Sequence, residues 1–184
     1  MSTSAAAGIQ VGPEPVPRAD LAGSGPARRW HDVVLGVFAV IVVAHWAEHL
    51  VQAFQIYALG WATPDALGVV GLWYPWLIRA EMLHYGYAIV MLVMLWVLRD
   101  GFTGTARRWW MLAFWLQFWH HIEHFLLLLQ ATFGFTLGGG PVPMSLLQFF
   151  VPRVELHLFY NTLVTAPMVV AMCLHARARA GARR

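Results

Sequence analysis

Histidine and glutamate recur together in a motif that occurs twice in the chain. Both copies have the pattern H-x-x-E-H-x5-Q, and they comprise His45, Glu48, His49 and Gln55, then His120, Glu123, His124 and Gln130. Residues three and four apart share one face of a helix, so the two imidazoles and the carboxylate of each copy can point the same way. Neutral imidazole together with carboxylate suits zinc, iron, manganese and copper. The motif therefore predicts transition-metal chemistry.

A second pair of segments is also repeated. Residues Arg79–Tyr87 and Arg153–Tyr160 share the pattern R-x-E-x(0,1)-L-H-x-x-Y. A proline, which suits the first turn of a helix, precedes each segment: Pro75 by four residues and Pro152 directly. Two matched motifs in the same order indicate one two-helix hairpin written twice. Both hairpins begin on the same side of the membrane, so we expect a pseudo-twofold axis along the membrane normal.

We expect the polar residues of both repeats to meet in one layer between the helices, within about 10 Å in depth. The predicted metal ligands are His45, Glu48, His49, Glu81, His84, His120, Glu123, His124, Glu155 and His157. Glu48 and Glu123 are the predicted catalytic groups. The predicted neighbours of the ligands are Arg79, Arg153, Tyr87, Tyr160, Gln55, Gln130, Asn161 and His121. Glu155 and His157 are only two residues apart, so either one of them points elsewhere or the first turn of that helix is irregular.

Four apolar stretches must position these residues. With 59% hydrophobic and 11% charged side chains, the chain is too apolar for an ordinary soluble domain. Residues 33–58, 74–98, 108–132 and 151–174 each reach the length of about 20 apolar residues that a membrane-spanning helix needs. The predicted fold is an all-α integral membrane protein, a bundle of four transmembrane helices built from two duplicated hairpins.

The distribution of arginine predicts the orientation. Every basic residue is Arg, and Arg lies before the first stretch, between the second and third, and after the fourth. The positive-inside rule then places both termini in the cytoplasm of a multi-pass protein of the cell membrane. We expect a disordered cytoplasmic tail at 1–29, a transmembrane domain at 30–176 and a basic tail at 177–184. The single Cys173 excludes an intramolecular disulfide, and no basic stripe with stacking aromatics indicates nucleic-acid binding.

Four glutamates in a low dielectric need cations to neutralise them. We therefore predict a dinuclear non-haem metal centre, with di-iron favoured and copper or zinc open. In design this set is similar to carboxylate-bridged two-metal proteins, whose Glu-x-x-His element Glu81 and His84 match. The predicted function is a metal-dependent oxidoreductase acting on oxygen or a lipid-soluble substrate. A hydrolytic zinc site, in which a metal-bound water attacks, stays open.

Two other functions use the same residues. A b-type haem could take His45 with His120, or His49 with His124, as axial ligands. A chain of Glu and His could instead carry metal ions or protons, with several copies assembling into a homo-oligomer. Polar groups also serve simply as contacts between membrane helices, although packing needs far fewer of them. The expected partners are membrane lipids and a lipid-soluble or extracytoplasmic small-molecule substrate or redox partner.

Overall fold

The structure, a computed structural model, describes residues 26–181, with side chains from Arg29 onward. Its elements are α1 (Pro26–Tyr57), α2 (Val70–Trp73), α3 (Pro75–Arg79), α4 (Glu81–Leu98), η2 (Arg99–Gly101), α5 (Gly104–Phe133), η3 (Leu137–Gly139), η4 (Leu147–Phe149) and α6 (Arg153–Gly181). No strand occurs within this range, so the all-helical class is confirmed. Of the predicted N-terminal tail, residues 1–25 lie outside the described residues, as do 182–184 of the basic tail. Residues 177–181 continue α6.

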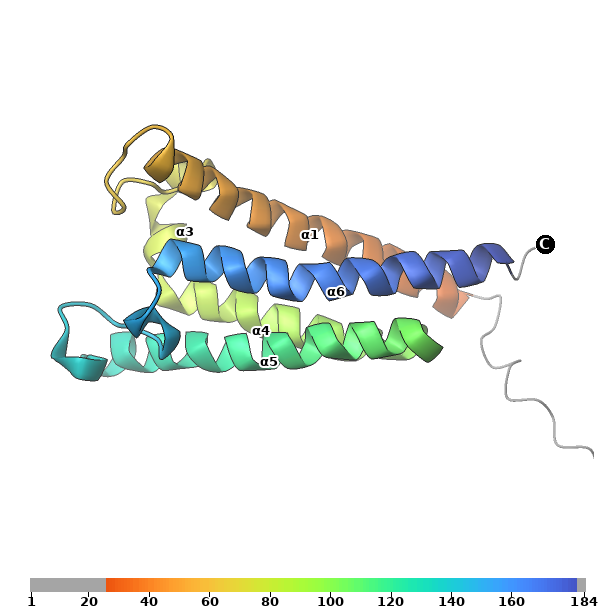
Figure 1. Ribbon diagram of the computed structural model, residues 1–184. Helices are drawn as coiled ribbons and strands as arrows, with labels where there is room; N and C mark the ends of the chain where they lie inside the picture. The colour runs from red at the N-terminus through yellow and green to blue at the C-terminus, as the bar shows by residue number, and fades with distance from the viewer. Residues whose placement is uncertain (1–25, 182–184) are drawn as a thin grey trace, which may run out of the picture.

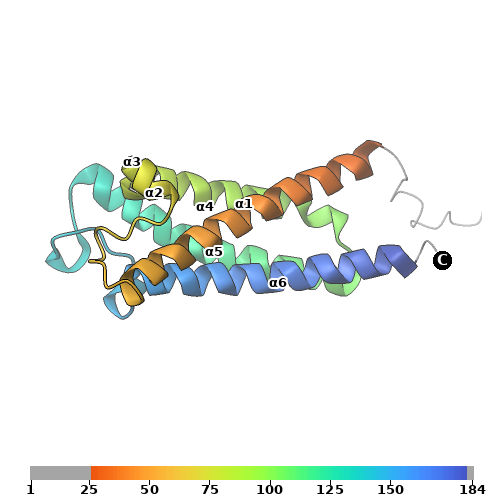
Figure 2. The same cartoon turned by 90° about the horizontal axis from the view of Figure 1, so that it is seen from above.

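Four long helices, α1, α4, α5 and α6, form an elongated bundle (Figure 1). The start of α1, the end of α6 and the connection from α4 to α5 lie at one end, here called the terminal end. The two long connections, 58–74 and 134–152, lie at the other, here called the loop end. Helix α5 packs against both α4 and α6, whereas α1 leans mainly on α6, barely contacts α4, and runs obliquely across the bundle (Figure 2).

An apolar core fills the half of the bundle nearer the terminal end. Trp110 of α5 is fully buried there, stacks on Phe102 at 4.2 Å between ring centroids, and donates its indole N–H to Leu95 O at 2.7 Å. At the outer edge of this half, Arg179 of α6 pairs with Asp32 of α1. The polar motifs therefore lie in the other half, toward the loop end.

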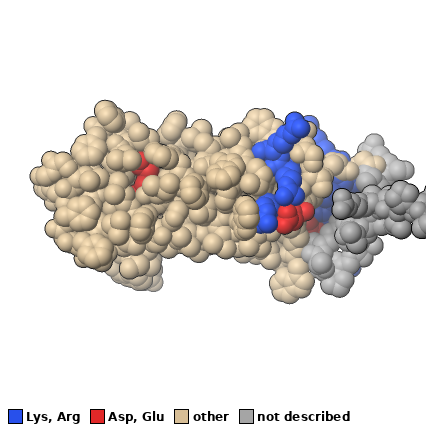
Figure 3. Space-filling model, turned by 90° about the horizontal axis from the view of Figure 1, so that it is seen from below, with Lys and Arg blue, Asp and Glu red and all other residues tan. Residues whose placement is uncertain are grey.

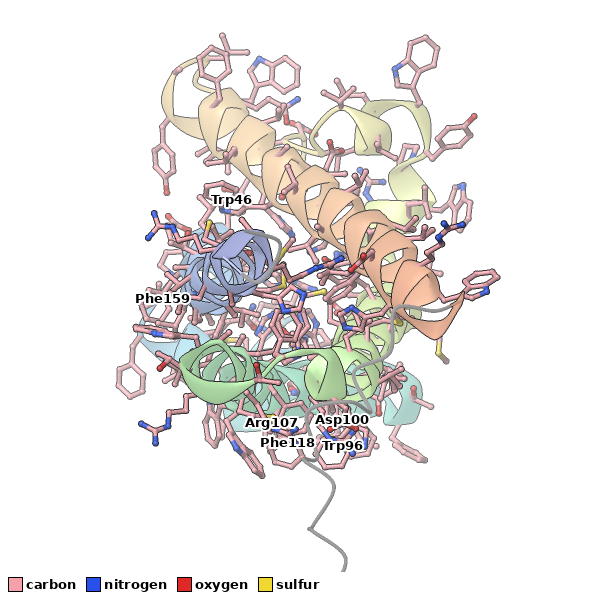
Figure 4. The ribbon with its side chains drawn as sticks, turned by 90° about the vertical axis from the view of Figure 1, so that its right-hand side faces the viewer. Trp46, Trp96, Asp100, Arg107, Phe118 and Phe159 are labelled. Atoms are coloured by element: carbon pink, nitrogen blue, oxygen red, sulfur yellow. The ribbon has the colours of Figure 1, made fainter. Side chains whose placement is uncertain are left out.

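Many large apolar side chains face outward. Figure 4 looks along the bundle from its terminal end and has Trp96, Phe118 and Phe159 on the periphery. Each of these side chains is more than 40% exposed. On the face drawn in Figure 3, arginines gather near the terminal end, and the surface toward the loop end is almost free of charge. An apolar exterior around polar interior groups is the pattern expected of a protein surrounded by lipid.

Three described helical segments are long and apolar enough to cross a membrane: Arg29–Tyr57, Glu81–Gly101 and Arg153–Gly181. Helix α5, the third predicted span, is 30 residues long, but its amino-acid composition is not apolar enough for it to be counted with these three. The reason is its polar residues, because Gln117, His120, Glu123 and His124 all lie in its middle. All four of these side chains are buried inside the bundle.

The predicted second span, 74–98, is not one continuous helix. The chain leaves helical geometry at Ala80 (φ −88°, ψ 108°), which separates α3 from α4. The segments on the two sides of the break are held by different helices of the bundle. Helix α4 packs along α5, whereas the chain just before α3 is tied to α1 by Glu48, so the chain must turn between them.

Candidate functional site

Six histidines from the four long helices meet inside the loop-end half of the bundle. They are His45 and His49 of α1, His84 of α4, His120 and His124 of α5, and His157 of α6. We call this set the imidazole cluster. His157 is its centre, with ring centroids 5.1 Å from both His49 and His124, 5.8 Å from His120 and 6.3 Å from His84.

The two histidines of each H-x-x-E-H motif form a hydrogen-bonded pair. The Nε2 atoms of His45 and His49 are 3.2 Å apart, and those of His120 and His124 are 3.1 Å apart. One nitrogen of each pair must donate a proton and the other accept it, so at least one ring of each pair is neutral. In the first pair, His49 Nδ1 donates to Gln52 Oε1 at 2.7 Å, which leaves His49 Nε2 as the acceptor.

His84 and His157 are each oriented by a backbone carbonyl one turn earlier in the chain. His84 Nδ1 donates to Ala80 O at 3.1 Å, and His157 Nδ1 donates to Arg153 O at 2.7 Å. A neutral imidazole that donates from Nδ1 carries a lone pair on Nε2. Most metal-binding histidines are held in this way, with one ring N–H on a carbonyl or carboxylate and the other nitrogen free for the metal.

The spacing of the rings is also that of metal ligands. Because a metal–imidazole bond is about 2.0–2.1 Å long, two imidazoles on one ion hold their ring centroids roughly 5 Å apart. The 5.1 Å separations around His157 match this value. Even so, within residues 26–181 no group of three or more His, Cys, Asp or Glu side chains is arranged to hold a metal ion. Within each pair the two Nε2 atoms are hydrogen-bonded to each other, so a ring of the pair would share an ion with His157 either through its Nδ1 atom or after turning.

The glutamates do not gather as the imidazoles do. Glu48 Oε1 accepts hydrogen bonds from Val70 N at 2.6 Å and Gly71 N at 3.3 Å, so its carboxylate serves the first turn of α2. Glu155 accepts a hydrogen bond from the hydroxyl of Tyr57. These two side chains have partners outside the cluster.

Glu81 forms an ion pair with Arg153. Its two carboxylate oxygens lie 2.6 and 2.7 Å from the two terminal nitrogens of the guanidinium. The pair joins the start of α4 to the start of α6 and neutralises both charges. An acidic side chain in the first turn also favours helix formation there.

Glu123 is the glutamate that shares a cavity with three histidines of the imidazole cluster. It is 3% exposed, its Oε2 lies 3.5 Å from Leu147 N, and its Oε1 has no hydrogen-bond partner among the described residues. It lines a cavity of about 10 Å³, here called the small cavity, together with His120, His124 and His157, and these side chains are all buried. Each of these histidines also has one buried ring nitrogen without a partner in the described part of the chain. A space of this size holds about one water-sized particle.

The two motif glutamines fasten the loops that follow their own helices. Gln55 binds both backbone groups of Gly68, at 2.8 Å from N and 3.2 Å from O. Gln130 accepts from Leu137 N at 2.9 Å and Met144 N at 3.2 Å, and donates to Met144 O at 2.8 Å. Both glutamines are buried and position the loops over the loop end.

The predicted neighbours occupy several positions around the cluster. Tyr87 stacks on His45 at 3.8 Å between ring centroids, and Tyr160 packs on His120 at 4.3 Å. His121 lies to one side, 5.2 Å from the Tyr85 ring of α4. Asn161 is partly buried, and its amide nitrogen has no partner among the described residues. Arg79 is exposed at the end of α3.

Three further polar residues belong to the site and were not predicted. Gln52 orients His49, Gln117 donates to Ala88 O at 3.2 Å between α5 and α4, and Ser145 lines the small cavity. Helical spacing could have identified the two glutamines, since Gln52 follows His49 by three residues and Gln117 precedes His120 by three. No periodic signal could have identified Ser145, which lies in a loop.

Contacts recur in matched pairs between the two halves of the chain. The Nε2–Nε2 pairs, the tyrosine on the first histidine of each pair, the carbonyl-held histidines, and the glutamine holding a loop each occur once per half. The packing of α1 breaks this correspondence, because α1 barely contacts α4 whereas α5 packs closely on α6. Comparison of the chain with protein-family models, with curated proteins and with solved structures gives no match.

Proposed function

We propose that this chain is an integral membrane protein whose imidazole cluster binds transition-metal ions, and that it acts as an oxidoreductase on oxygen or a lipid-soluble substrate. One observation carries the proposal. His84 and His157 each donate Nδ1–H to a backbone carbonyl, which leaves an Nε2 lone pair free for a cation inside a cluster of six imidazoles. So many buried polar groups in an apolar bundle mark a functional site.

The small cavity is the better-supported position for an ion. His120, His124, His157 and Glu123 surround it, and each has an atom that lacks a partner among the described residues. Unsatisfied buried polar atoms are costly, and a bound cation would satisfy several of them at once. His84 Nε2 and His45 Nδ1 are the nitrogens left for a second ion, because both ring nitrogens of His49 have partners. A dinuclear centre therefore stays within the proposal.

The donor set favours metals that accept several imidazoles. Glu48 and Glu155 bind elsewhere, so the site has less carboxylate than a carboxylate-bridged di-iron centre uses. Imidazole-rich sites suit copper, zinc and iron. Copper and iron supply one-electron chemistry at such a site, and we propose one of these for an oxidoreductase. The chain's own contribution is to hold the rings, to exclude bulk water, and to offer the Glu123 carboxylate as a proton acceptor.

We further propose that α5 is a fourth membrane span and that both termini are cytoplasmic. Four of the polar residues that lower the hydropathy of α5, namely the ones given above for its middle, are buried, while Trp115, Phe118 and Phe125 on its outer face are exposed. Lipid would therefore meet an apolar surface on this helix as on the other three. The arginines near the terminal end support the orientation (Figure 3). The matched contacts of the two halves support duplicated hairpins.

Metal analysis of the purified full-length protein tests the central proposal. We expect copper or iron at one or two ions per chain, and reoxidation of the reduced protein by oxygen with a change in its electron paramagnetic resonance spectrum. His157→Gln should lose most of the metal, whereas His31→Gln should retain it, since His31 lies at the terminal end on Leu98 O. If the wild-type protein is metal-free after growth with added copper and iron, the proposal is overturned. If its absorption spectrum has a Soret band, the cofactor is haem and the proposed non-haem centre is wrong.

The glutamates provide a second matched pair of variants, which does not depend on the folding of a cluster histidine variant. Glu123→Gln should reduce bound metal, because it removes the charge beside the small cavity. Glu48→Gln should keep it, because this side chain binds the amides of α2. Equal loss in both variants would contradict the distinct roles assigned to the two carboxylates.

A further inference from the structure

A second, larger cavity lies at the loop end beside the imidazole cluster. Its volume is about 500 Å³, and α1, α3, α4, α6 and the loop after α1 surround it. Cavities of roughly 300–1,000 Å³ are typical of sites that bind small molecules. Apolar side chains form much of its wall, including Ala66, Leu67, Ile78 and Val154.

The charges that line this cavity do not balance. Arg153 is neutralised by Glu81 through two short contacts. Arg79 also lines the cavity, and among the described residues it has neither an ion pair nor a hydrogen-bond partner. One arginine is therefore available beside a mostly apolar space. The planar guanidinium matches carboxylate and phosphate oxygens with paired hydrogen bonds.

The inner wall of this cavity is the imidazole cluster itself. His49, His84 and His157 line it, and His157 lines the small cavity as well. A molecule in the larger cavity would therefore lie on one side of His157, with the proposed ion position on the other. Helices α1 and α4, which both line the larger cavity, contact each other only weakly.

We propose that the larger cavity binds an amphiphile with an apolar body and a single oxyanion, the oxyanion on Arg79 and the body against the apolar wall. The inference rests on the proposed function in one respect, namely that the bound molecule would be the substrate of the metal centre. A carboxylate and a phosphate monoester share the required chemistry, so both are used as probes.

The test measures displacement of radiolabelled dodecanoate from the full-length protein in nanodiscs of zwitterionic lipid. Unlabelled dodecanoate or dodecyl phosphate should displace the label, and the tighter of the two identifies the oxyanion. Dodecanol should compete at least about tenfold more weakly, because it lacks the charge that Arg79 binds. Equal competition by dodecanol would mean that only the apolar chain is bound, and would overturn the proposal.

Arg79→Gln should weaken dodecanoate binding by about tenfold or more, whereas Arg108→Gln, an exposed arginine at the terminal end, should leave it unchanged. Arg79→Lys should bind dodecanoate more tightly than Arg79→Gln but more weakly than the wild type, because lysine keeps the positive charge and lacks the planar guanidinium. No effect of Arg79→Gln would overturn the proposal. Metal content is measured on the same samples, so that probe binding without metal counts against the proposed function alone, and metal without probe binding counts against this inference alone.

Discussion

Replacing Gln130 by Leu separates two roles for the repeated motif. The sequence places Gln130 beside the predicted ligands, whereas the structure uses it to hold the loop that follows α5. Its side chain is 1% exposed and binds Leu137 N, Met144 N and Met144 O. Leucine keeps the approximate size and the helix propensity but removes all of these bonds.

The expected cost follows from the bonds that are lost. Three loop backbone groups lose their partner, and at about 1 kcal/mol each the loop is destabilised by about 3 kcal/mol. Gln55→Leu, the matched change in the first half, loses two bonds to Gly68 and should cost about 2 kcal/mol. The control Gln117→Leu loses one bond to Ala88 O, far from the loop.

Amide hydrogen exchange measures this opening directly. In Gln130→Leu, the amides of Leu137 and Met144 should exchange about a hundredfold faster than in the wild type, and bound metal should stay the same. In Gln117→Leu, these two amides should exchange at the wild-type rate. Unchanged exchange at Leu137 and Met144, combined with loss of metal, would refute the reasoning and return Gln130 to the metal site.

Two further changes test the supports of the site. Gly68 has φ +74°, and a Cβ there would overlap the Glu48 carboxylate, so Gly68→Ala should lower the free energy of unfolding by at least about 1–2 kcal/mol. Gly36 lies in a helix with open space around it, so Gly36→Ala should raise the free energy of unfolding by up to about 1 kcal/mol. Denaturant titrations measure both changes, and equal effects of the two substitutions would contradict this account. For the Glu81–Arg153 pair, a double-mutant cycle with Glu81→Gln and Arg153→Gln should give a coupling free energy of about 1–3 kcal/mol, and a value near zero would mean that the ion pair does not hold α4 to α6.

The all-helical class could be predicted because long apolar runs leave the backbone no other way to satisfy its hydrogen bonds. Helical periodicity also indicates which residues share a face, as with His45 and His49 or His120 and His124. Periodicity does not set the direction of a long side chain. Glu48 is on the face predicted for it by spacing, yet its carboxylate binds α2, whose position depends on a loop that carries no periodic signal.

The break at Ala80 and the two cavities were not predictable for a related reason. Residues 75–98 contain no internal Pro or other strong helix breaker at position 80, and the break arises from the anchors on either side of it. The larger cavity depends on how α1 packs relative to α4 and α6, and the smaller one on how α5 packs on α6, and both are matters of packing between segments distant in sequence. The pairing of Glu155 with Tyr57 likewise joins residues 98 positions apart.

X-ray absorption spectroscopy at the absorption edge of the bound metal tests most directly the central claim that the imidazole cluster binds this metal. If the imidazole cluster holds the ion, the nearest scatterers are nitrogen at about 2.0–2.1 Å, with the outer-shell pattern of imidazole rings, and that pattern weakens in His157→Gln. A shell made of oxygen alone, or an imidazole pattern unchanged in His157→Gln, would contradict the assignment of the metal to this cluster.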